Sequence, residues 1–137
     1  MAVNYKKAER MVEDILSNND EVLAISIIGM RGNIVAAKSK ESFKEDFKVT
    51  QDRSKYGGTL AVEMLSLVNQ VRNMVGAVKA IITLHESCKL MLVPVSPCQV
   101  LVGIVLKRSS VNTHDYDMAN WIERLVAYAL DDSITYI

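Results

Sequence analysis

Few residues of this sequence could carry chemistry, and His85, Cys88, Cys98 and His114 are the ones that could together bind a metal ion. Thiolate and neutral imidazole are ligands that zinc prefers. The spacing argues against a zinc site, because only His85 and Cys88 are close in sequence and no Cys-x-x-Cys pair occurs. We therefore expect no metal and no cofactor, and we expect both cysteines to be small buried apolar residues.

A disulfide between the two cysteines is disfavoured by the expected strand pairing. If the chain turns at Pro94–Pro97, antiparallel pairing places Cys88 opposite residues near Gly103 and away from Cys98. Pro94-x-x-Pro97 formally matches a proline-rich ligand, but turn formation between two strands explains it better.

No motif in the sequence predicts a reaction. The Gly-x-Ser-x-Gly turn of a serine nucleophile is absent, and His85 and His114 are expected at solvated positions in a loop and at a helix start. Gly57-Gly58 could leave backbone amides free for a phosphate, but the pattern of a phosphate-binding loop is missing. A change of chain direction before a helix explains this pair more simply. We expect the protein not to be an enzyme.

Length and composition limit the class of protein. The 137 residues carry 16 Lys+Arg against 16 Asp+Glu, a net charge of +0, and 50% of them are hydrophobic. A chain of this size hides roughly two thirds of its unfolded surface, so a single domain over residues 1–137 is expected without any covalent staple. Zero net charge removes the general electrostatic case for a nucleic-acid partner.

The sequence also predicts where the protein resides. Its apolar runs are far shorter than the ~20 residues of a membrane span, so no membrane insertion is expected. Charged residues follow the amino terminus directly, without the apolar segment of a secretory signal. A cytoplasmic location is the resulting expectation.

Hydrophobic periodicity predicts the elements that must position these residues. Amphipathic spacing predicts helices at 5–18, 52–75 and 115–130, and short β-branched runs predict five strands. The first two strands form a hairpin around a glycine turn, and the last three form an antiparallel meander. The fold class is α+β, a five-stranded antiparallel sheet in an α-β-β-α-β-β-β-α order with helices packed on it. The expected strands span residues 22–28, 33–38, 78–84, 89–93 and 99–106.

A charged insertion occupies residues 39–56. Its large apolar side chains include Phe43 and Phe47, four positions apart, and we expect these rings to pin a short helical segment to the body of the protein. The alternating charges around them are typical of a solvated face.

The long helix at 52–75 carries more apolar surface than one side of a sheet requires. Beside its main apolar stripe, Leu60, Leu67 and Met74 repeat every seven residues. Either the first helix or the charged insertion covers this excess within the monomer, or the excess is a surface for self-association.

Two segments carry a resemblance to a known family. Asp20–Gly29 followed by Arg31–Ala36 is similar to the opening hairpin of the roadblock/dynein light chain superfamily, and more loosely of longin and profilin-like domains. The long helix that leads into Ala77–Ile82, with the meander through Leu90–Val95, is the second shared feature. The resemblance covers most of the chain and extends to small archaeal proteins of this type. The insertion at 39–56 is longer than in a minimal roadblock domain.

The resemblance implies a non-enzymatic homodimeric scaffold that binds and regulates a protein partner such as a small GTPase. It implies that the long helix and a neighbouring sheet edge pair across a two-fold axis. The alternative is a small-molecule sensor, which a large apolar pocket between sheet and helix would favour. The dimer contacts that the resemblance implies are Leu60, Met64, Leu67, Val71, Met74, Lys79 and Ile81.

Overall fold

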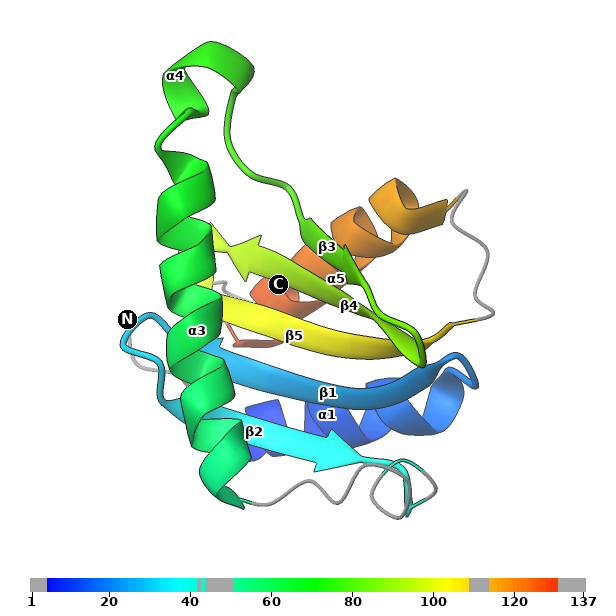
Figure 1. Ribbon diagram of the computed structural model, residues 1–137. Coiled ribbons are helices and arrows are strands. Elements are labelled where there is room, and N and C mark those ends of the chain that lie inside the picture. The colour runs from blue at the N-terminus through cyan, green and yellow to red at the C-terminus, as the bar shows by residue number, and fades with distance from the viewer. Residues whose placement is uncertain (1–4, 42, 44–50, 109–113, 131–137) are drawn as a thin grey trace.

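The computed structural model describes residues 5–41, 43, 51–108 and 114–130 (Figure 1). Phe47 and most of the charged insertion therefore lie outside the described residues. The expected order of helices and strands is confirmed, with one additional short helix, α4. The elements are α1 (Tyr5–Asn18), β1 (Val22–Gly29), β2 (Ile34–Ser39), α3 (Gln51–Asn69), α4 (Arg72–Val75), β3 (Ile81–Leu84), β4 (Cys88–Val95), a 3-10 turn (Ser96–Cys98), β5 (Val100–Lys107) and α5 (Asp115–Leu130).

The five strands form one antiparallel sheet in the order β2-β1-β5-β4-β3. The hairpin β1-β2 and the meander β3-β4-β5 are confirmed, and they join where β1 pairs with β5, so that Ile25 lies opposite Ile104. This arrangement puts β2 and β3 at the two edges.

Two helices cover one face of the sheet. α1 and α5 lie behind the strands in Figure 1 and bury the larger core against them. Every second residue of the strands contributes to this core, because side chains two positions apart point to the same face of the sheet. The fully buried members include Ala8, Ile15, Ile27, Met91, Val93, Val102, Ile104, Ile122 and Val126.

In the part of the chain that the structure describes, a single helix, α3, crosses the opposite face (Figure 1). The core beneath it is smaller and consists of Ile28, Ala61, Leu92 and Leu101, with Met64, Leu65 and Ile81 packed against it. The exposed apolar side chains on this side of the described structure lie on α3 itself and on α4.

The expected long helix is interrupted, which corrects the prediction of one continuous helix at 52–75. α3 ends at Asn69, and the amides of Gln70 and Val71 donate to carbonyls three residues back, at Leu67 and Val68. This tighter turn is common at helix ends. α4 then adds one separate turn that projects beyond the end of the sheet (Figure 1).

The meander differs from expectation in its boundaries. β3 begins only at Ile81, because the residues before it lead the chain from α4 back to the sheet. β4 is longer than expected and continues through Pro94 and Val95. The longer strand moves the turn to Ser96–Cys98, so Cys88 lies opposite Lys107 and Leu92 lies opposite Gly103. The predicted pairing of Cys88 near Gly103 is therefore wrong by four residues.

Gly57-Gly58 lies inside α3 and not before it, which corrects the expected change of direction. A Cβ atom at Gly58 would overlap the carbonyl oxygen of Gly32, in the turn between β1 and β2. Gly32 itself has a φ of 86°, a left-handed conformation that favours glycine. The two glycines let α3 approach the hairpin closely.

Candidate functional site

A row of exposed apolar side chains runs along α3 and α4, and it is here named the α3–α4 patch. Leu67 is 65% exposed, Val75 76% and Met74 84%. Large contiguous apolar surface on a soluble protein marks sites of interaction. The patch consists of Leu60, Leu67, Val68, Val71, Met74 and Val75.

The structure brings four of the seven expected dimer contacts together in this patch, namely Leu60, Leu67, Val71 and Met74. Val68 and Val75 also belong to the patch. Val75 lies on α4, the separate turn that follows the interruption after Asn69.

The other three expected contacts have different surroundings. Met64 and Ile81 are half-buried and pack against the core beneath α3, so they support the fold. Lys79 is exposed, and its Nζ lies 4.0 Å from Glu123 Oε2 of α5. Lys79 thus faces the other layer of helices rather than the patch.

The patch contains two charged side chains of opposite sign. Glu63 lies between Leu60 and Leu67 on α3, and Arg72 begins α4; both are exposed. Among the described residues neither has an ion-pair partner within 4.0 Å.

The neighbouring sheet edge, β3, is also exposed. Ile82 and Leu84 point to the face that carries α5, where they are 40% and 56% exposed. Among the described strands β3 pairs only with β4, so its outer backbone groups remain available to another strand.

The four residues considered for zinc lie on separate elements. His85 is exposed after β3, where its Nε2 lies 2.9 Å from Thr83 Oγ1, whereas Cys88 is buried at the start of β4. Cys98 is buried beside the Val126 carbonyl, and His114 is exposed near α5. Within the described part of the chain no three His, Cys, Asp or Glu side chains gather as metal ligands would.

Both cysteines are buried, as expected. Burial raises the pKa of the Cys88 thiol above its usual value, because desolvation disfavours the thiolate. A nucleophilic cysteine requires the opposite shift.

Sequence analysis missed a buried ion pair. Lys89 of β4 is 2% exposed, and its Nζ lies 2.7 Å from Asp115 Oδ1 at the start of α5. The sequence contained a signal for this ion pair, because Lys89 lies within a run of apolar residues that is typical of a strand. Because a lysine is almost never buried without a partner, a carboxylate nearby could have been expected.

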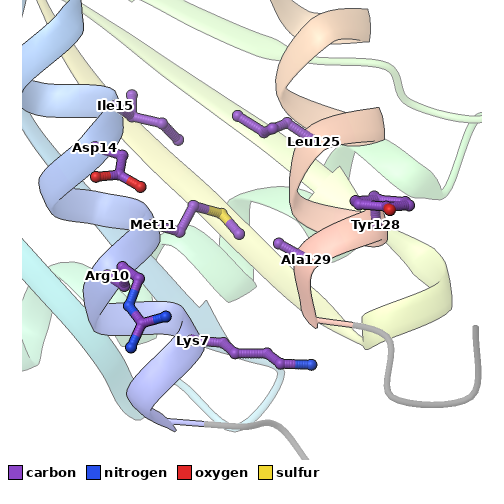
Figure 2. Close-up of a pocket in the computed structure, with 8 residues that line it drawn as sticks. All are labelled: Lys7, Arg10, Met11, Asp14, Ile15, Leu125, Tyr128 and Ala129. Atoms are coloured by element: carbon purple, nitrogen blue, oxygen red, sulfur yellow. The ribbon is translucent and has the colours of Figure 1, made fainter. Parts of the chain in front are cut away.

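A shallow groove of about 260 Å³ lies between α1 and α5 (Figure 2). Met11, Ile15 and Leu125 are among its apolar lining residues, and Lys7 and Arg10 lie on the α1 side. This groove is on the helix-covered surface, not between the sheet and a helix where the sensor alternative requires a pocket.

The fold defined by this sheet and these helices is that of roadblock/LC7 domains, within the wider profilin-like class. The chain superposes on the Roadblock/LC7 domain from Streptomyces avermitilis with a TM-score of 0.68 at 10% identity, over 88% of this chain and 94% of that one. MglB from Myxococcus xanthus gives a TM-score of 0.68 at 4% identity over 98% of both chains. Profilin IB from Acanthamoeba castellanii gives 0.58 at 18% identity over 88% of this chain and 94% of that one.

These similarities confirm the predicted resemblance in fold. No sequence model of a known family matches the chain, and no curated protein matches it by sequence. In the described residues no helix has both the length and the apolar character needed to cross a bilayer.

Proposed function

We propose that the protein is a non-enzymatic, homodimeric scaffold whose α3–α4 patch is buried between two copies. The single observation that carries this proposal is the exposure of six large apolar side chains along α3 and α4 and the residue between them, Val71. Burying such surface is the main favourable term in association. The open edge of β3 beside the patch would let the two sheets adjoin.

The fold supports this proposal, because one similar structure is described as MglB with a tetrameric arrangement. That protein shares 16% identity and a TM-score of 0.66 over 92% of both chains. Its assembly shows that surfaces of this fold can join several copies.

Solution mass across a range of concentrations tests the dimer. We expect light scattering to give twice the monomer mass for the wild type and the monomer mass for Leu67→Glu, with unchanged far-UV circular dichroism. Tyr116→Glu is the matched control, since it places the same charge at an exposed aromatic residue on α5. A monomeric wild type, or a Leu67→Glu protein that remains dimeric, would contradict the proposal.

The dimer would present a partner-binding surface, and we propose a small GTPase as the partner class because the roadblock resemblance implies it. Calorimetric titration of purified small GTPases in GDP-bound and GTP-analogue-bound forms measures this directly. We expect one nucleotide state to bind more tightly, since regulation requires a difference in affinity between states. Absence of binding in both states would leave a scaffold with another protein partner.

A further inference from the structure

The groove between α1 and α5, here named the α1–α5 groove, combines apolar lining with an excess of positive charge. Within the described part of the chain its charged lining residues are Lys7, Arg10 and Asp14. Tyr128 remains 54% exposed although it lines the groove. A segment that carries both apolar side chains and negative charge would fit this surface. The apolar lining residues are Met11, Ile15, Leu125, Tyr128 and Ala129.

A segment of this chemistry follows α5 directly in the sequence. Residues 131–137 lie outside the described part of the chain and have the sequence Asp-Asp-Ser-Ile-Thr-Tyr-Ile. Two carboxylates come first, and three large apolar side chains follow. In an extended conformation side chains two positions apart point the same way, so Ile134 and Tyr136 would share one side.

We propose that residues 131–137 turn back at the end of α5 and occupy the α1–α5 groove of the same chain. The acidic pair lies beside Lys7, and Ile134 and Tyr136 pack on the apolar lining. The groove is on the face of the sheet opposite to α3, so this contact does not depend on the proposed dimer (Figure 1).

The direction of the two helices supports this assignment. Figure 2 shows Lys7 at the end of the groove where Ala129 lies, whereas Ile15 and Leu125 lie at the other end. The side chain of Lys7 extends from α1 toward the last turn of α5. The segment therefore starts at the positively charged end of the groove, and its two acidic residues come first.

The segment is long enough to follow the groove. Lys7 and Ile15 are eight residues apart on α1, roughly 12 Å of helical rise. Residues 133–137 span up to about 17 Å when extended. Three of these five residues are β-branched, which favours an extended chain. The two preceding aspartates disfavour further helix, because the carboxyl end of a helix carries partial negative charge.

Covalent attachment favours this occupant over a separate peptide. The groove, at about 260 Å³, is smaller than the roughly 300–1,000 Å³ of typical ligand pockets, so a free segment would bind weakly. A short flexible link gives an attached segment an effective concentration in the millimolar range. Weak intrinsic binding is therefore sufficient to keep the groove occupied by residues 131–137.

Cleavage of the full chain by thermolysin tests this docking. Thermolysin cuts before large apolar residues, and mass spectrometry follows cleavage of the Ser133–Ile134 bond. Tyr128→Glu places a negative charge in the groove, and we expect about tenfold faster cleavage, because a docked segment is cut only while it is undocked. Tyr116→Glu makes the same change at an exposed tyrosine of α5 that does not line the groove, and should leave the rate unchanged.

A second pair of variants tests the charges. Lys7→Glu sets a negative charge against the two aspartates and should also accelerate cleavage, whereas Lys6→Glu changes the net charge equally outside the groove and should not. Far-UV circular dichroism of each variant should match that of the wild type.

Three outcomes would overturn the docking. One is a wild type that is cut as fast as a synthetic peptide of residues 127–137. Another is wild-type cleavage in both Tyr128→Glu and Lys7→Glu. The third is a rate that falls as the protein concentration rises, because the segment would then occupy the groove of a second copy.

Discussion

The Nζ of Lys89 lies 2.7 Å from Oδ1 of Asp115, and this ion pair joins the buried start of β4 to the first turn of α5. Lys89 points into the layer between the sheet and α5, where its ammonium group is almost fully removed from water. A charge in such a place requires a charged partner, because desolvation strongly disfavours it otherwise.

We expect Asp115→Ala to lower the free energy of unfolding by about 3 kcal/mol, because it removes the carboxylate from a buried ammonium group. Lys89→Met/Asp115→Ala should recover much of that loss, since the unbranched apolar side chain needs no counter-charge. Urea unfolding followed by circular dichroism measures both. A double variant no more stable than Asp115→Ala would contradict the role assigned to the pair.

Gly58→Ala should destabilise the protein by about 1 to 3 kcal/mol, as overpacked contacts do. The added Cβ would meet the backbone oxygen of Gly32, which cannot move aside as a flexible side chain could. Alanine is otherwise the better helix former, so Ser66→Ala at an exposed position of α3 is the control and should be neutral or mildly stabilising. If thermal melting shows that both variants are more stable than the wild type, the close approach of α3 to Gly32 is refuted.

The Lys38–Glu13 pair predicts a pH dependence. Lys38 Nζ donates to Glu13 Oε1 at 2.8 Å, and this hydrogen bond, with the lysine's charge, holds the pKa of Glu13 below its usual value. The folded pKa is lower than the unfolded one, so the pair stabilises the fold above the unfolded pKa. That contribution is lost as the pH falls through the folded pKa.

Lys38→Met should return the pKa of Glu13 to its ordinary range, as measured by NMR titration of the side-chain carboxyl carbon. Glu9, an exposed glutamate of the same helix, serves as the internal reference. An unchanged Glu13 titration in Lys38→Met would show that the lysine does not cause the shift.

Cys88 should react slowly with thiol reagents in the native protein. Its burial both blocks access and raises the pKa of the thiol, and the thiolate is the reactive form. We expect iodoacetamide labelling at pH 8 to be at least about tenfold slower than in denaturant, because a raised thiol pKa leaves little thiolate. Rapid native labelling at Cys88, located by mass spectrometry, would contradict this burial.

Local patterns predicted most of the fold. The apolar spacing of α1 and α5 and the β-branched runs of β1 and β5 have the correct period over enough residues to identify each element. The glycine turn at Gly29–Gly32 correctly predicted the hairpin.

The errors arose where contacts distant in sequence decide the structure. Gly57-Gly58 resembles a break before a helix, and only the crossing over Gly32 explains glycine within it. The first residue of β3 depends on where the chain returns from α4, which an apolar run beginning at Val78 does not reveal.

The candidate site was predicted in part for the same reason. The seven-residue repeat indicated an excess of apolar surface at Leu60, Leu67 and Met74 and left open whether the monomer covers it; these three side chains are exposed. The resemblance also implied Met64 as a contact, but Met64 packs inward, because the boundary between core and surface on α3 depends on which strands lie beneath it.

The pairing of β1 with β5 has a consequence for how the chain folds. These strands form the centre of the sheet, yet most of the described chain lies between them. The β1-β2 hairpin can form early and pack against α1, but the inner edge of β1 must wait for β5 to emerge. Such long-range closure makes folding slower than that of a helical bundle of similar size. During synthesis, the edge of β1 that later pairs with β5 would stay exposed until β5, which ends at Lys107, has left the ribosome.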